Sequence, residues 1–233
     1  NAHDFFAKIK GGLIVSCQAE DNDPFDSPEG VALFARAAEM GGASAIRSCG
    51  IEKTIRIISR IGLPVIGLTK AKFDDGSVKI TRNEQEVLRL FEIGCAMVAV
   101  DGTFRPWDGL TGPEFIAKIK KLTGKPVMAD ISTRDEGLAC EAAGADCLST
   151  TLSGYTPETR NDQRKGPDFE LIESLTASVR IPVIAEGRIT SPDHAVRALE
   201  RGAFAVVAGT AITRPRIVTS WYVRAMRGEG WQH

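Results

Sequence analysis

Two ionisable residues, Lys70 and Glu186, lie at the ends of short apolar runs, where their side chains could transfer protons. The runs are Pro64–Leu68 and Pro182–Ala185. An amine in a partly desolvated cavity can act as a base near neutral pH, and a carboxylic acid can return the proton. Two such groups on well-separated strands would address opposite faces of a substrate carbon. The alternative is that Lys70 is a surface lysine at the start of a loop and that Glu186 pairs with a nearby arginine.

Four other polar residues hold similar positions and are candidate substrate contacts, namely Gln18, Arg47, Asp130 and Arg214. The two arginines could bind phosphate or orient a substrate hydroxyl, because guanidinium suits bidentate anion recognition. Arg47 could instead neutralise Asp130 or Glu186. Asp130 is favoured as a group that orients Lys70, with a buried ion-pair role as the alternative. Gln18 is expected to hydrogen-bond to the substrate.

The segments AEGRI and AGTAITRP predict a phosphate site built from backbone and side-chain groups. Glycine lets backbone N–H groups approach an anion, and the start of a short helix favours negative charge. The candidate phosphate-binding residues are Gly187, Arg188, Gly209 and Thr210. The alternative is that these glycines only allow tight turns.

Short apolar runs recur along the chain at intervals of roughly 30 residues, each followed by a polar or glycine-containing turn. The eight runs are Leu13–Cys17, Ala43–Ile46, Pro64–Leu68, Met97–Val100, Val127–Ala129, Cys147–Leu148 with its neighbours, Pro182–Ala185 and Phe204–Ala208. Nearly continuous apolar strands are typical of a parallel sheet covered by helices.

Amphipathic helices are predicted between these runs at Pro28–Met40, Asn83–Glu92, Gly112–Leu122, Arg134–Ala143 and Ser191–Arg201. Glycine recurs at helix ends just before the next strand, where it closes a helix in the left-handed conformation. Eight such units predict an α/β fold that is one (β/α)₈ TIM barrel of the phosphate-binding type over residues 1–233, with a lead-in at 1–11 and a tail at 220–233. An open dinucleotide-binding sheet is disfavoured, because no G-x-G-x-x-G follows the first run.

Composition narrows the possible partners and compartment. Lys plus Arg is 29 and Asp plus Glu is 30, so neither nucleic acid nor a membrane surface is expected as a partner. No stretch approaches the roughly 20 apolar residues of a membrane span. The five scattered cysteines form no C-x-x-C and predict reduced thiols in the cytoplasm. With His194 as the one histidine between His3 and His233, no metal site is expected.

The order of these segments resembles the N-acetylmannosamine-6-phosphate 2-epimerase family from about Gly12 to about Arg224. The segments that carry the resemblance are LIVSCQA, ASAIRSCG, PVIGLTK, VAVDGTFRP, VMADIST, DCLSTTLSGYT, IPVIAEGRI and AVVAGTAITRP. It implies cytoplasmic sialic acid catabolism, with inversion at C2 of a phosphorylated amino sugar and without a cofactor. It also implies that Lys70 is the base at C2 and Glu186 its acid partner, although a one-base mechanism with rotation of the intermediate also fits.

Three competing functions are weighed against this interpretation. Ribulose-phosphate 3-epimerases are similar in length and rhythm but rely on strand-end histidines and a metal. A Schiff-base aldolase would use Lys70 as a nucleophile. A non-catalytic sugar-phosphate sensor would need the phosphate loops more than an acid and a base. The tail departs most from the family, and its Trp221, Tyr222 and Trp231 could pack on the barrel or on a second subunit of a homodimer.

Overall fold

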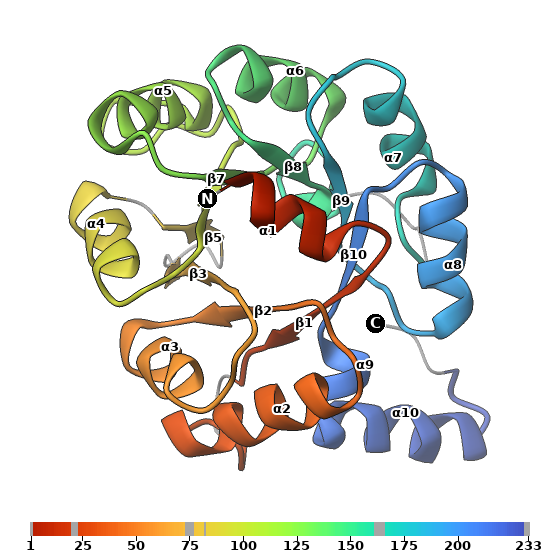
Figure 1. Cartoon of the computed structure of the whole chain (residues 1–233). Helices are drawn as coiled ribbons and strands as arrows, with labels where there is room; N and C mark the ends of the chain where they lie inside the picture. The colour runs from red at the N-terminus through yellow and green to blue at the C-terminus, as the bar shows by residue number, and fades with distance from the viewer. Residues whose placement is uncertain (1, 20–22, 73–76, 82, 161–165, 231–233) are drawn as a thin grey trace.

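The computed structural model describes residues 2–19, 23–72, 77–81, 83–160 and 166–230, and its centre is a closed barrel of parallel strands (Figure 1). Around the ring the strands follow the order β1-β10-β9-β8-β7-β6-β3-β2. Their bounds are β1 Leu13–Cys17, β2 Ala45–Cys49, β3 Val65–Leu68, β6 Met97–Asp101, β7 Val127–Asp130, β8 Cys147–Ser149, β9 Val183–Ala185 and β10 Ala205–Ala208. The predicted (β/α)₈ barrel is confirmed.

The boundary of one strand differs from the prediction in a way that matters for chemistry. The second run was expected to end at Ile46, but β2 continues to Cys49, so Arg47 lies inside the strand and not after it. Arg47 stands in register with Ser16 of β1 and Ile66 of β3. A buried charge in a strand is tolerable only when opposite charges face it, and the site described below supplies them.

Helices form the ring outside the barrel (Figure 1). Their bounds are α2 Pro28–Met40, α3 Ile51–Ile58, α4 Glu84–Glu92, α5 Gly112–Thr123, α6 Arg134–Ala142, α7 Phe169–Thr176 and α8 Pro192–Glu200. Apolar positions spaced three and four apart bury one face of each helix against the strands. Val31 and Ala35 of α2, for example, share a core cluster with Val15 and Ile46. None of the helices within the described ranges is long and apolar enough to cross a membrane.

Capping residues set the helix ends, including the glycines that the sequence predicted. Ser191 caps α8 by accepting a hydrogen bond from the His194 N–H, and Pro192 takes the first helical position. Glycines with φ between 90° and 102° follow four helices, at Gly42, Gly94, Gly144 and Gly202. Glycine adopts this left-handed region without steric cost, so each helix can stop and the chain can turn directly into the next strand.

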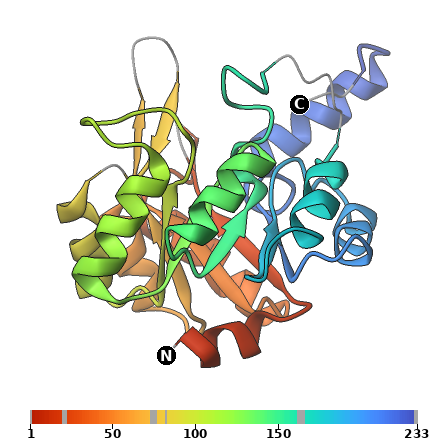
Figure 2. The same cartoon turned by 90° about the horizontal axis from the view of Figure 1, so that it is seen from above.

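The two ends of the barrel differ (Figure 2). One is closed by α1 (Ala2–Ile9), whose Phe5 and Ile9 are buried in the cluster that fills the barrel interior. From the opposite end projects an antiparallel hairpin of β4 (Lys70–Lys72) and β5 (Val78–Ile80). The sequence predicted neither element, because α1 fell in the expected lead-in and each hairpin strand has only three residues.

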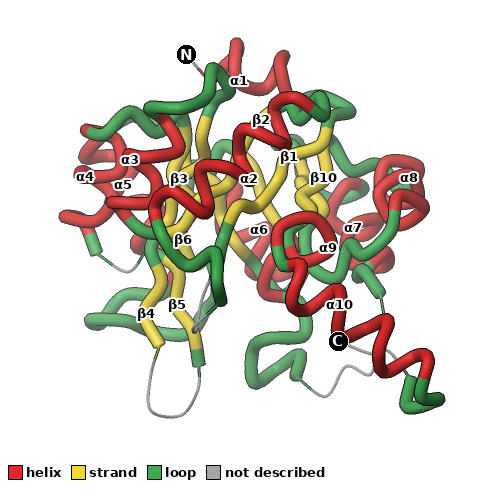
Figure 3. The backbone as a smooth tube through the Cα atoms, turned by 90° about the horizontal axis from the view of Figure 1, so that it is seen from below, coloured by secondary structure: helices red, strands yellow, loops and turns green. Residues whose placement is uncertain are grey.

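After β10 the chain forms two further helices, α9 (Thr210–Thr213) and α10 (Pro215–Met226), and α10 extends outward beyond the barrel (Figure 3). Trp221 of α10 is buried, whereas the Tyr222 side chain is 70% exposed. Trp231, the third aromatic residue of the predicted tail, lies outside the described residues. A single 3₁₀ turn, Thr150–Leu152, follows β8 and becomes important in the site.

Candidate active site

A cavity of about 400 Å³ opens at the end of the barrel opposite α1. It is lined by Ser16, Gln18, Lys70, Val78, Ile80, Thr151, Leu152, Tyr155, Glu186, Gly187, Arg188, Ile189, Thr190, Val207, Gly209, Thr210 and Arg214. All the site residues predicted from the sequence therefore share one cavity lining, except Arg47 and Asp130. These two lie beneath its floor, where their side chains are 1% and 0% exposed.

Arg47 and Asp130 form a buried ion pair inside the barrel. Arg47 Nη1 donates to Asp130 Oδ1 at 3.0 Å, and Arg47 Nη2 contacts Asp130 Oδ2. Arg47 Nη1 also lies 3.0 Å from Glu186 Oε2. Burial disfavours the charged guanidinium, but the Asp130 and Glu186 carboxylates outweigh this and raise the pKa of Arg47 above its ordinary value. Arg47 therefore remains a permanent cation under the cavity.

This pairing changes the hypothesis for Asp130. The sequence favoured Asp130 as the group that orients Lys70, but its hydrogen bonds run to Arg47 and to the Thr151 hydroxyl, the latter at 2.9 Å. The reason is the extension of β2, which brings the Arg47 side chain into the barrel interior, where it reaches β7. The neutralising role considered for Arg47 is the one observed. Direct contact of either residue with a substrate stays a prediction.

Glu186 holds its carboxylate between the ion pair and the cavity. Its Oε2 accepts hydrogen bonds from the hydroxyls of Ser149 at 3.2 Å and Thr151 at 3.0 Å, in addition to the Arg47 contact. Among the described residues, no hydrogen bond reaches Oε1. Because the side chain is 13% exposed and Glu186 lines the cavity, this oxygen is the one available to a ligand.

The environment of Glu186 shifts its pKa upward. Burial raises the pKa of Glu186 and the Asp130 charge raises it further, while Arg47 and the two hydroxyls lower it. The net direction is upward from the ordinary value. The backbone is fixed as well, because the Thr150 hydroxyl accepts from the Glu186 N–H at 3.0 Å and donates to its carbonyl at 2.8 Å. Glu186 is thus a well-positioned candidate acid.

Lys70 approaches the same cavity from the other side. It is the first residue of β4 and follows β3 closely, whereas Glu186 follows β9. In the ring order, β3 is the fourth strand from β9 in either direction, so the two strands are directly opposite. Lys70 and Glu186 therefore line one cavity from opposite walls, as the sequence predicted for a base and an acid.

Gln18 and Ser16 form the wall near β1. Gln18 Nε2 donates to Ser16 Oγ at 2.7 Å, which orients the amide. Gln18 Oε1 is buried and has no hydrogen-bond partner among the described residues, although the side chain lines the cavity. A buried acceptor without a partner carries a free-energy cost that a ligand donor would remove. Arg214 Nε donates to the backbone carbonyl of Gln18 at 3.3 Å and completes this wall.

The two glycine loops that the sequence predicted as a phosphate site both reach the cavity. Gly187 has φ 104° and Arg188 φ 55°, so consecutive residues after β9 are left-handed. Gly209 follows β10 and Thr210 begins α9, whose first N–H groups have no acceptor within the helix. Both loops line the cavity. This is the arrangement that binds phosphate in many barrels of this type.

The Arg188 side chain is committed to the protein itself. Its Nε donates to the Gly166 carbonyl at 2.7 Å and its Nη1 to the Ser153 carbonyl at 2.8 Å. The guanidinium also lies 5.8 Å from the centre of the Tyr155 ring. Arg188 thus holds the segment after β8 against the cavity, and its predicted phosphate contact stays a prediction.

Sequence reasoning missed the roles of two site residues. Thr151 lies in the 3₁₀ turn after β8, and its hydroxyl is within hydrogen-bond distance of both the Asp130 and the Glu186 carboxylates. Tyr155, 54% exposed at the cavity wall, lies in an irregular loop without a periodic pattern. Nothing in the sequence near Tyr155 indicates its position. The hydroxyl residues Ser149 and Thr151 follow a predicted strand next to the one that ends at Asp130, and this could have suggested the contact between Thr151 and Asp130.

Together, the fold and the cavity define a (β/α)₈ barrel of the phosphate-binding class, with an amine and a carboxyl group in the lining of one cavity. The family model described as "Putative N-acetylmannosamine-6-phosphate epimerase" matches residues 31–228. The chain belongs to the N-acetylmannosamine-6-phosphate epimerase family.

Two relatives carry the name "Putative N-acetylmannosamine-6-phosphate 2-epimerase". The protein from Caldanaerobacter subterraneus is 48% identical over 223 residues, covering 94% of this chain and 93% of the relative. The protein from Clostridioides difficile is 44% identical over 219 residues, covering 94% and 97%. The solved N-acetylmannosamine-6-phosphate 2-epimerase from Clostridium perfringens is 41% identical, with a TM-score of 0.87 over 94% of this chain and 95% of that chain. A thiamine phosphate pyrophosphorylase from Pyrococcus furiosus shares the fold at 19% identity and TM-score 0.60.

Proposed function

We propose that the chain interconverts N-acetylmannosamine 6-phosphate and N-acetylglucosamine 6-phosphate by inverting C2, as an N-acylglucosamine-6-phosphate 2-epimerase of sialic acid catabolism. The relatives that match nearly the whole chain carry this activity in their names. The observation that carries the proposal is the placement of Lys70 and Glu186 on opposite walls of one cavity, beside two glycine loops. Inversion requires access to both faces of one carbon, and this arrangement supplies it.

The glycine loops are the proposed anchor for the substrate phosphate. Gly187 lets the chain pass close to an anion, and the start of α9 at Thr210 adds N–H donors and a favourable helix dipole. Holding the phosphate at the wall between β9 and β10 sets the distance from the anchor to C2. Binding energy from this remote group then positions the reacting carbon between the two catalytic groups.

The proposed reaction begins with the open-chain sugar, in which the C1 aldehyde acidifies the proton on C2. Lys70 Nζ, as the free amine, removes that proton from the manno epimer. The C2–H electron pair forms the C1–C2 double bond while the C1–O1 π pair moves onto O1, which gives an enolate, and reprotonation at C2 restores the C1 carbonyl. Protonated Glu186 then delivers its proton from Oε1 to the other face of C2. Lys70 ends as an ammonium and Glu186 as a carboxylate, and proton exchange with solvent restores both. The proposal needs no cofactor and no metal.

The buried ion pair has a specific part in this proposal. When Glu186 gives up its proton, a negative charge appears on a group already 3.0 Å from Arg47 and bonded to two hydroxyls. These partners stabilise the carboxylate without rearrangement, which is the advantage of a preorganised site. Asp130 keeps Arg47 in place while adding a charge that favours the protonated form of Glu186 in the resting state.

The orphan acceptor of Gln18 indicates how the substrate is oriented. Gln18 Oε1 can accept from a sugar hydroxyl or from the acetamido N–H, and the Ser16 contact holds the amide in the orientation that presents this oxygen. Gln18→Leu should therefore raise KM with a smaller effect on kcat, because it removes a binding contact and not a proton-transfer group.

Two further proposals concern the environment of the enzyme. All five cysteines are free thiols, which agrees with a reducing cytoplasm, where a sugar phosphate is also retained.

We also propose a homodimer that covers the exposed Tyr222 and Met226 side chains of α10. Light scattering of the wild type and of Tyr222→Ser/Met226→Ser would show a dimer that the double variant weakens, and a monomeric wild type would contradict this.

The test of the reaction is proton NMR of N-acetylmannosamine 6-phosphate incubated with the enzyme in D₂O, without added metal or nucleotide. The expected result is N-acetylglucosamine 6-phosphate deuterated at C2, formed by wild type and not by Lys70→Ala. An unchanged, protonated substrate would contradict the epimerase proposal. Borohydride should not trap the protein on its substrate, because trapping would indicate imine chemistry at Lys70.

A further inference from the structure

The proposed base is carried by the part of the site that stands outside the barrel. Lys70 pairs with Ile80 across the hairpin, and Ala71 pairs with Lys79. A two-stranded hairpin is marginally stable by itself, so its position must be fixed by contacts with the barrel. Those contacts decide where the Lys70 amine lies relative to the substrate carbon.

Thr81 holds the base of the hairpin in an unusual conformation. It is buried and has φ 46°, a left-handed value that is a genuine outlier for a β-branched residue. Its N–H donates to the Thr69 carbonyl at 2.9 Å, and its Oγ1 accepts from the Thr69 N–H at 3.2 Å. The same hydroxyl donates to the Ala99 carbonyl of β6 at 2.6 Å. One side chain therefore ties the residue before Lys70 to the barrel wall.

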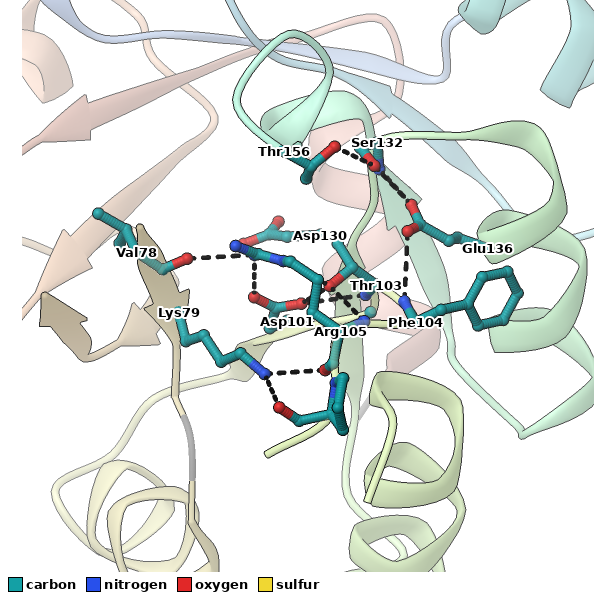
Figure 4. Close-up of polar contacts among 12 residues, drawn as sticks. Val78, Lys79, Asp101, Thr103, Phe104, Arg105, Asp130, Ser132, Glu136 and Thr156 are labelled. Atoms are coloured by element: carbon teal, nitrogen blue, oxygen red, sulfur yellow. Dashed lines mark hydrogen bonds and ion pairs between the residues drawn. The ribbon is translucent and has the colours of Figure 1, made fainter. Parts of the chain in front are cut away.

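Lys79 and Arg105 hold the outer part of the hairpin (Figure 4). Lys79 Nζ donates to the Arg105 and Pro106 carbonyls at 2.8 and 2.6 Å. Arg105 Nη2 donates to the Val78 carbonyl at 3.1 Å and to Asp101 Oδ2 at 2.7 Å. The hairpin and the loop after β6 are thus joined in both directions, by a lysine from one and an arginine from the other.

The loop that carries Arg105 is itself fixed to the barrel. Asp101 Oδ1 accepts from the Thr103 N–H at 3.0 Å and from its hydroxyl at 2.6 Å. Buried Glu136 accepts from the Phe104 N–H at 3.2 Å and from the Ser132 N–H and hydroxyl, both at 2.8 Å (Figure 4). The loop after β6, which holds the hairpin, is therefore also connected through Glu136 to the loop after β7.

We propose that Thr81 is a positioning residue for the reaction, and that it acts with Lys79 and Arg105 to set the place of the Lys70 amine. The strain at Thr81 keeps its hydroxyl between Thr69 and Ala99, where a relaxed backbone would not hold it. This proposal rests on the proposed role of Lys70 as the base. Strained backbone persists where surrounding contacts enforce it, and such residues cluster at active sites.

The first test compares Thr81→Ala with Thr81→Ser. Both remove the γ-methyl group, and they differ only by the hydroxyl that contacts Thr69 and Ala99. Thr81→Ala should lower kcat by on the order of 100-fold, because small displacements of a catalytic group are costly. Its KM should stay within about threefold, since the phosphate loops lie after β9 and β10. Thr81→Ser should restore kcat to nearly the wild-type value.

A second, independent variant guards against misfolding of Thr81→Ala. Lys79→Met keeps the side-chain stem and removes the hydrogen bonds to the Arg105 and Pro106 carbonyls. Its matched control is Lys120→Met, because Lys120 Nζ also donates to a backbone carbonyl, that of Lys125 at 3.0 Å, and to Asp146 at 2.7 Å. Those groups precede β7 and β8, at the other end of the barrel. Lys79→Met should lower kcat about tenfold, and Lys120→Met should lower only the melting temperature.

The outcomes separate this proposal from the proposed function. Lys70→Ala, measured in parallel, reports on the base alone, and an active Lys70→Ala would contradict the proposed function. If Lys70→Ala is inactive while folded Thr81→Ala and Lys79→Met keep wild-type kcat, the positioning proposal is wrong and the function stands. Equal losses of kcat in Thr81→Ser and Thr81→Ala would also overturn it, because the hydroxyl would then play no part.

Discussion

The two walls of the cavity hold their ionisable groups by opposite means. Glu186 follows a barrel strand and contacts the buried Arg47 of the Arg47–Asp130 pair and the hydroxyl of Thr151. Lys70 lies on a hairpin outside the barrel, which long polar side chains fix in place. The proton affinity of the acid is therefore set by burial and by neighbouring charges, while the position of the base is set by side-chain hydrogen bonds to backbone groups.

The barrel and the hairpin therefore meet different requirements, one for the acid and one for the base. A carboxyl group that must remain protonated needs burial and a nearby negative charge, and the barrel interior provides both. A lysine that must approach a substrate needs reach and an accessible path, which a hairpin at the mouth provides. Substitutions of Arg47 and Glu186 should therefore change stability or its pH dependence, whereas substitutions at the hairpin should act mainly on kcat.

The largest expected effect is that of Arg47→Met on stability. It leaves the Asp130 carboxylate buried without its cation, which should cost about 3 to 5 kcal/mol of unfolding free energy and the activity as well. The matched control is Arg89→Met, because Arg89 and its partner Glu92 are both exposed, and exposed pairs contribute at most about 1 kcal/mol. Urea denaturation measures both. Similar losses of unfolding free energy in the two variants would show that the buried Arg47–Asp130 pair contributes no more to stability than an exposed pair does.

The next largest effect is that of Lys70→Ala on the rate. We expect kcat to fall by about 10³-fold, within the usual range for acid–base catalysis, with little change in unfolding free energy. Lys72→Ala is the control, because Lys72 belongs to the same strand but does not line the cavity. A stopped assay for the gluco epimer would follow both variants. Loss of activity in Lys72→Ala equal to that in Lys70→Ala would count against a specific role for the Lys70 amine.

The raised pKa of Glu186 predicts a pH dependence of stability. The folded state retains the Glu186 proton to a higher pH than the unfolded state does, so this group makes wild type lose stability as pH rises from the ordinary glutamate pKa to the raised one. The slope is at most about 1.4 kcal/mol per pH unit. Glu186→Gln, which cannot ionise, should lack this component. Parallel stability curves for the two proteins, measured by denaturation from pH 4 upward, would refute the assignment.

The smallest effect expected is that of Thr151→Val on the rate. The Thr151 hydroxyl is one of three partners of Glu186 Oε2, and a typical hydrogen bond contributes about 1 kcal/mol, so kcat should fall roughly five- to tenfold. Because that hydrogen bond lowers the pKa of Glu186, its loss should move the pH dependence of the rate further upward. Thr151→Ser is expected to behave as wild type in the same pH–rate series.

The barrel was predictable because its signals are local. Apolar runs such as Leu13–Cys17, glycines such as Gly202 at helix ends and the cap at Ser191 each act over a few residues. Polar residues at strand ends therefore located the cavity, since parallel strands bring their ends to one face. The loops at Gly187 and Gly209 were located in the same way.

What escaped prediction depends on partners far away in the chain. In the sequence, the charge of Arg47 indicates the end of a strand. Its burial is tolerable because Asp130, 83 residues later, and Glu186 both pair with it. The hairpin strand at Lys70 has no apolar face, and it is fixed by contacts to β6 and to the loop at Arg105. The left-handed backbone at Thr81 has no sequence signal, because threonine rarely adopts it.

The proposal that Lys70 and Glu186 act on opposite faces of C2 is tested most directly by hydrogen–deuterium exchange at C2. The experiment uses Glu186→Gln in D₂O and starts separately from each epimer. If Lys70 and Glu186 serve opposite faces, this variant should exchange the C2 proton of N-acetylmannosamine 6-phosphate while forming almost no product. N-acetylglucosamine 6-phosphate should keep its proton. Exchange of both epimers at similar rates, or epimerisation at the wild-type rate, would contradict the account and assign both proton transfers to Lys70 alone.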